Sequence, residues 1–77
     1  MKLPIVSAKQ LIEILSKQGF YVARQKGSHV ILKKRALGKV FTAVVPNHAE
    51  IRVGTLLSIL RQAGVSKQDF IKIVAET

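Results

Sequence analysis

The sequence contains no cysteine and no tryptophan, and only four of its 77 residues are acidic. Without cysteine, the chain cannot form a disulfide, a cysteine zinc site or a thiol nucleophile. No apolar run approaches the roughly 20 residues that a membrane-spanning helix needs. No membrane-surface partner is expected either, since no helix is both basic and strongly amphipathic. Two histidines and four scattered acids form no recognisable metal-binding cluster, and no glycine-rich nucleotide loop is present. We therefore expect no metal or cofactor. The length of 77 residues suits a single domain over residues 1–77.

Positive charge is abundant and unevenly placed. Thirteen Lys and Arg against four Asp and Glu give a net charge of +9, and no acidic residue lies between Glu13 and Glu50. Such a surface can serve solubility alone, but its one-sidedness favours a nucleic acid, because cations that neutralise phosphates release counterions. With one Tyr and no Trp, few aromatic side chains are available to stack on bases, so contacts to the nucleic-acid backbone are expected. The expected RNA-binding residues are Lys26, Ser28, Lys33, Lys34, Arg35 and Lys39.

Apolar spacing predicts two amphipathic helices. The first is expected over residues 8–18, between Ser7 as N-cap and Gly19 as a stop signal. The second is expected over residues 54–63 and ends at Gly64. The apolar faces comprise Ala8, Leu11, Ile12 and Leu15 in the first helix and Leu56, Ile59, Leu60 and Ala63 in the second.

Between these helices the sequence predicts three strands, over residues 20–25, 28–34 and 40–45. Lys26-Gly27 is expected to form a tight turn, residues 35–39 a short basic loop, and Pro46 to stop the last strand. In the second strand, alternation places His29, Ile31 and Lys33 on one face and Val30 and Leu32 on the other.

The expected fold class is α+β, with the order α-β-β-β-α and a short extra helix at the C-terminal end. Three consecutive strands with short links should pair as an antiparallel sheet, and the helices should cover one of its faces. The extra helix opens at Ser66, where Ser-Lys-Gln-Asp resembles a capping box. Phe70, Ile71 and Val74 are expected to face inward.

His29 is the first candidate catalytic residue. It follows a glycine-containing turn at the start of a predicted strand, inside the basic stretch. An imidazole titrates near neutrality and can accept and donate protons at working pH. The alternative is a strand histidine that only packs its ring and hydrogen-bonds its edge.

His48 is the second candidate, as an acid or base paired with His29, or as a phosphate contact in a loop. Ser28 is a weak nucleophile candidate, and phosphate contact or turn stabilisation suits it better.

Three segments together resemble the HicA toxin family, the small mRNA interferases of type II toxin–antitoxin pairs. They are Lys26-Gly27-Ser28-His29-Val30, Val45-Pro46-Asn47-His48, and the stretch from Gly54-Thr55-Leu56 to Arg61-Gln62-Ala63-Gly64. The resemblance extends from Ser7 to Phe70. It implies a fold like that of double-stranded-RNA-binding domains, and cleavage of mRNA and tmRNA that inhibits translation. It also implies His29 as the catalytic residue, a HicB-type antitoxin as partner, and a prokaryotic cytoplasmic location.

The leading hypothesis is therefore a metal-independent endoribonuclease in which His29 acts as general base. Lys26, Lys33 and Lys34 are expected to stabilise the developing charge on phosphorus. A rival hypothesis is a non-catalytic RNA-binding module of the same fold. A DNA-binding accessory protein is a third, disfavoured because no helix-turn-helix with a basic recognition helix is visible.

Overall fold

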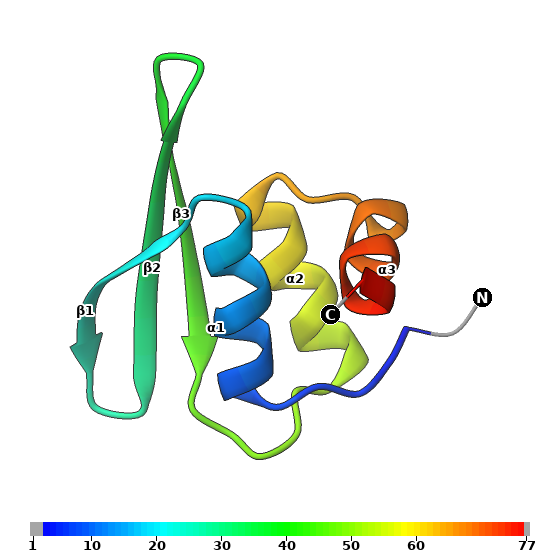
Figure 1. Cartoon of the computed structure of the whole chain (residues 1–77). Coiled ribbons are helices and arrows are strands. Elements are labelled where there is room, and N and C mark those ends of the chain that lie inside the picture. Colours follow the sequence, from blue (N-terminus) through cyan, green and yellow to red (C-terminus); the bar gives the residue numbers. More distant parts are fainter. Residues whose placement is uncertain (1–2, 77) are drawn as a thin grey trace.

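A computed structural model describes residues 3–76 and gives the element order helix, three strands, two helices. Both neighbouring strand pairs are antiparallel, in the sheet order β1-β2-β3. The helices lie on one side of the sheet, and α3 is the farthest from it (Figure 1). The predicted α+β fold class is confirmed. The elements are α1 (Ala8–Lys17), β1 (Tyr21–Lys26), β2 (His29–Ala36), β3 (Lys39–Pro46), α2 (Val53–Ala63) and α3 (Lys67–Glu76).

The core lies between the helices and the inner face of β2 and β3. Val30 and Leu32 are buried there, as the alternation in β2 predicts. All four residues of the predicted apolar face of α2 are buried, whereas in α1 Ile14 is buried and Ile12 is only half-buried. Within residues 3–76 no polar or charged side chain is buried, so catalytic chemistry has to be sought on the surface.

Local signals explain where the helices begin and end. Ser7 and Gln10 form a capping box: the Gln10 N–H donates to Ser7 Oγ, and the Ser7 N–H donates to Gln10 Oε1. Gly64 ends α2 in the left-handed region, with φ of 71°. A Cβ at this glycine would lie 3.1 Å from the Phe41 ring, so both the backbone and the packing require glycine here.

The turns differ from the predicted ones. Residues 35–39 are not a loop, because β2 runs to Ala36 and β3 starts at Lys39. Only Leu37 and Gly38 form the turn, with φ of 55° and 72°, as in the type I′ turns that suit strand twist. At the other end of β2 the turn is Gly27-Ser28 rather than Lys26-Gly27. Because leucine is not a turn-forming residue, the sequence does not indicate that the turn between β2 and β3 is only two residues long.

The C-terminal helix belongs to the core. Phe70 is fully buried, and Ile73 and Val74 pack against the buried cluster. Ile71, predicted to face inward, is half-buried and lines a surface hollow with Ser66 and Lys67 instead of packing against the buried cluster. An inward stripe at i, i+3 and i+4 satisfies helical geometry better than the predicted i, i+1 and i+4. Ser66 caps α3, since its Oγ accepts the Asp69 N–H at 3.1 Å.

The two edge strands of the sheet differ in whether a helix covers them. At the β3 edge, the Val44 N–H donates to Gln62 Oε1 of α2 at 3.2 Å, so a helix side chain satisfies a free backbone group. All six residues of β1 are exposed, because no helix covers that edge. Across residues 3–76, no helix is long and apolar enough to cross a bilayer.

Candidate functional site

The face of the sheet opposite the helices carries most of the predicted site. Residues paired directly across an antiparallel sheet share a face, so the register assigns each side chain to one side. Lys26, His29 and Pro46 form one row, and the next row along β2 is Arg24, Ile31 and Val44. We call this surface the open sheet face. Its residues are Tyr21, Arg24, Lys26, His29, Ile31, Lys33, Arg35, Val40, Thr42, Val44 and Pro46.

A bulge in β1 decides which cations reach this face. The register shifts between Val22, which pairs with Leu32, and Arg24, which pairs with Ile31. The extra residue, Ala23, reverses the phase of the strand, so Arg24 and Lys26 join His29 on the open sheet face. Bulges commonly re-aim side chains in this way beside functional sites. Strict alternation from Tyr21 would have placed both cations on the helix side.

His29 stands at a corner of the open sheet face, as the first residue of β2, and its side chain is exposed. Lys26 is its direct partner across the hairpin, so their Cβ atoms are about 5 Å apart. The Gly27-Ser28 turn that joins them is tight because Gly27 adopts a φ of 59°. A phosphate resting on this corner therefore meets an imidazole and an ammonium group together, beside the exposed hydroxyl of Ser28.

His48 lies at the same end of the sheet. Its N–H donates to the Pro46 carbonyl at 2.8 Å, and its own carbonyl accepts the Ala8 N–H at 3.0 Å. The Asn47 N–H donates to the Ser28 carbonyl at 2.6 Å, which ties this loop to the turn before His29. The backbone that carries His48 is thus fixed against both α1 and the β1–β2 turn, while its side chain stays exposed. The sequence could not show this convergence.

The remaining predicted cations lie farther along the sheet. Lys33 shares the open sheet face but is four residues from His29, about 13 Å along the strand. Lys34 has the opposite phase: it pairs with Phe41 on the helix side, and its Nζ lies 5.7 Å from the centre of the Phe20 ring. The structure therefore brings Lys26, Ser28, His29 and His48 to one end and separates Lys34 from them.

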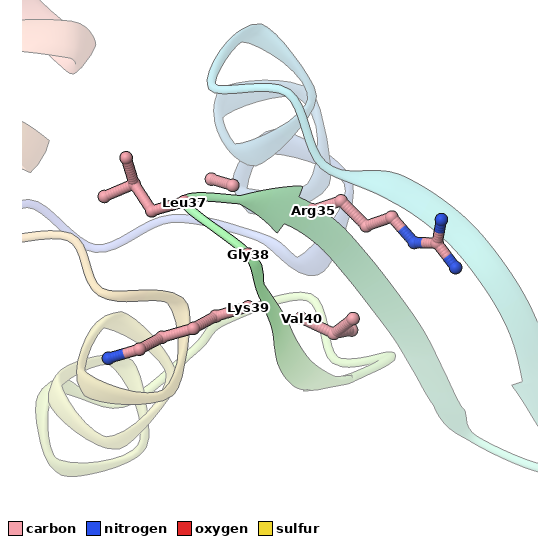
Figure 2. Close-up of a pocket in the computed structure, with 6 residues that line it drawn as sticks. Arg35, Leu37, Gly38, Lys39 and Val40 are labelled. Carbon is pink, nitrogen blue, oxygen red and sulfur yellow. The ribbon is translucent and has the colours of Figure 1, made fainter.

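Arg35 and Lys39 belong to the far end of the β2–β3 hairpin, at the opposite end of β2 from His29. Arg35 pairs with Val40 on the open sheet face, and Figure 2 shows both side chains on the same side of the hairpin. Lys39 extends to the other side, as does Leu37. Arg35 is therefore placed to contact a ligand that runs the length of the open sheet face, whereas Lys39 meets such a ligand only where it wraps around the end of the hairpin.

Arg24 is the residue that the sequence-based site omits. It is exposed, and it lies on the open sheet face in the row next to His29 and Lys26. Its face depends on the bulge at Ala23, and no glycine or proline marks that bulge in the sequence. Within residues 3–76, no group of three or more His, Cys, Asp or Glu gathers to hold a metal ion.

Comparison with known proteins identifies the family of the chain. Residues 8–65 match the family model described as the HicA toxin of bacterial toxin–antitoxin systems. No curated protein and no solved structure matches. The matched segment runs from the first residue of α1 to just beyond α2, and so includes the whole sheet, His29 and His48. The chain belongs to the HicA toxin family.

Proposed function

We propose that this toxin is a metal-independent endoribonuclease that cleaves mRNA and tmRNA in a prokaryotic cytoplasm and so halts translation. The observation that supports the proposal is the position of His29, exposed at the corner of a cationic sheet face with Lys26 directly across from it. A proton-transfer group and a phosphate-binding group are thus adjacent, and solvent and a long polyanion can both reach them.

In the proposed reaction, neutral His29 takes the proton from a ribose 2′-hydroxyl. The 2′-oxygen then bonds to the adjacent phosphorus, and the bond from phosphorus to the 5′-oxygen breaks. The products are a 2′,3′-cyclic phosphate and a 5′-hydroxyl, once the leaving oxygen has received a proton. Lys26, the cation beside His29, stabilises the negative charge that builds on the phosphate oxygens. Lys34 has no part in this step, because it lies on the other face of the sheet.

The other cations hold the RNA. Arg24 and Lys33 lie along the open sheet face, and Arg35 continues the line toward the hairpin turn. Ser28 supplies a hydroxyl at the β1–β2 turn for a phosphate oxygen. Contacts of this kind position the strand without reading its sequence. A HicB-type antitoxin is the proposed partner, and acidic groups on it would complement the same cationic face.

The proposal is tested by induced expression and by the chemistry of the product ends. Growth arrest on expression of the parent, and no arrest with His29→Ala, would support a toxic nuclease. In vitro, cleavage should persist in excess chelator and leave 2′,3′-cyclic phosphate ends. A 3′-hydroxyl product would contradict attack by the 2′-oxygen. RNA binding without any cleavage would instead support the non-catalytic RNA-binding module.

His48→Ala separates two roles for the second imidazole, general acid or phosphate contact. On ordinary RNA, either role predicts slower cleavage. On a substrate with an activated leaving group at the 5′ position, protonation of the leaving oxygen is no longer needed, so loss of a general acid should be largely repaired. If the rate of His48→Ala relative to the parent is the same on both substrates, His48 is a phosphate contact.

Arg24→Gln should weaken RNA binding and reduce its dependence on salt. Each cation that neutralises a phosphate on single-stranded RNA adds about 0.7 to the slope of log K against log salt. Removing Arg24 should therefore lower that slope by about 0.7. Titrations at several salt concentrations measure it, with Lys17→Gln in α1 as the control, since Lys17 lies away from the open sheet face. An unchanged slope would exclude Arg24 from the interface.

A further inference from the structure

The turn that joins β2 and β3 has a feature that the proposed reaction does not use. β1 pairs with β2 only as far as Lys33, so the end of the β2–β3 hairpin projects beyond the rest of the sheet (Figure 1). We call residues 35–40 the hairpin tip. Leu37 at its apex is 95% exposed, the most exposed of the large apolar residues in the described chain.

Leu37 is also conformationally unfavourable where it stands. Its φ of 55° is the only positive value at a non-glycine residue among residues 3–76. In this region a Cβ crowds the following carbonyl, so leucine is strained where asparagine or glycine is tolerated. Because almost none of the side chain is covered, burial does not compensate for the strain. Folding alone therefore gives no reason for leucine at this position.

Two cationic side chains flank this apolar apex. Arg35 and Lys39 emerge on opposite sides of the hairpin, and Leu37 extends from the turn itself (Figure 2). The nearest acidic residues in sequence are Glu13 and Glu50, well outside the tip. Nucleic-acid-binding proteins combine cations, which hold phosphates, with an apolar side chain that inserts against or between bases. A protein partner would need a far larger apolar surface than Leu37 and Val40, the two exposed large apolar residues of the tip, offer.

We propose that the hairpin tip is a second RNA-contact site, in which Leu37 packs against an unstacked base while Arg35 and Lys39 bind the flanking phosphates. The inference rests on RNA being the ligand of the proposed function. Seven residue steps separate His29 from Ala36, so the tip lies about 23 Å from the cleavage corner. Affinity should therefore depend on RNA length, because only RNA that spans this distance engages both ends of the sheet.

Leu37→Asn isolates the contact, since asparagine is the preferred residue in this turn and should relieve the strain. The melting temperature should rise by a few degrees, whereas affinity for long single-stranded RNA should fall roughly five- to tenfold on loss of a base contact. An oligonucleotide too short to span about 23 Å can occupy either end of the sheet, so its affinity should fall less. Ile5→Asn is the matched control: Ile5 is 67% exposed but lies on the N-terminal segment, outside the basic stretch.

The Kd values are measured in the full chain with His29→Ala in every protein, so that RNA stays intact. A larger loss of affinity for long RNA than for short RNA, with Ile5→Asn unchanged, supports the proposal. Unchanged binding of long RNA overturns the proposal and would favour a protein partner for the hairpin tip. An equal loss of affinity for both RNA lengths also overturns it. A parent that binds RNA without cutting it would refute the nuclease but not the tip. A parent that does not bind RNA refutes both.

Discussion

His29→Ala is expected to lower the rate of RNA cleavage by about 10²–10⁴-fold, the usual contribution of one general base. The loss should appear in the cleavage step and not in binding. His29 is exposed, so its truncation should leave the sheet and the cations on its open face in place. Both the RNA Kd and the melting temperature should stay close to those of the parent.

Single-turnover cleavage with the protein in excess measures the chemical step, and RNA affinity is measured separately. Val22→Ala is a suitable control, because Val22 is exposed on β1 of the same hairpin but pairs with Leu32 on the opposite face. It should cleave at nearly the parental rate. A His29→Ala protein that keeps its rate, or that loses RNA binding together with cleavage, would remove His29 from the catalytic role.

The sequence predicted β2 well because its environment is simple. One face packs on helices and the other meets solvent, so apolar and polar residues alternate with a period of two. Val30 and Leu32 are buried as predicted, and His29 is on the opposite face. The element order followed from similarly clear signals, such as the N-cap Ser7 and the C-terminal stop Gly64.

The edge strand and the site could not be predicted in the same way. All of β1 is exposed, so no apolar face marks its phase, and its bulge has no residue signature. The face carrying Arg24 and Lys26 is set by pairing with β2, a long-range property that local sequence does not contain. The proximity of the loop that carries His48 to the turn before His29 is equally non-local, because it depends on the bond from the Asn47 N–H to the Ser28 carbonyl.

Lys34 shows that a run of consecutive cations in the sequence does not predict a single cationic surface. Lys33, Lys34 and Arg35 are consecutive, but a strand sends alternate side chains to opposite faces, so three adjacent cations cannot serve one surface. Lys33 and Arg35 share the open sheet face, and Lys34 lies along the Phe20 ring instead. Period-two alternation applied to the cations would have separated them without a structure.

The family match and the fold do not cover the same residues. The match ends at residue 65, whereas α3 begins at Lys67 and contributes one of the largest fully buried side chains, Phe70. Val74 of α3 lines one surface hollow together with Val6 of the N-terminal segment and Ile14 of α1. The last helix is therefore expected to stabilise the fold without contributing to the cleavage site.

Phe70→Ala should accordingly cost about 3–5 kcal/mol of folding free energy, the usual range for deleting a buried ring. Domains have only about 5–15 kcal/mol in total, and a small one lies toward the lower limit, so much of this protein should unfold near 37 °C. Urea denaturation at low temperature measures the loss, and Ile71→Ala, on the outer side of the same helix, should lose far less. Where Phe70→Ala remains folded, its cleavage rate should match that of the parent, because α3 is the helix farthest from the sheet that carries His29. Equal losses of stability in the two variants would show that α3 does not pack on the core through Phe70.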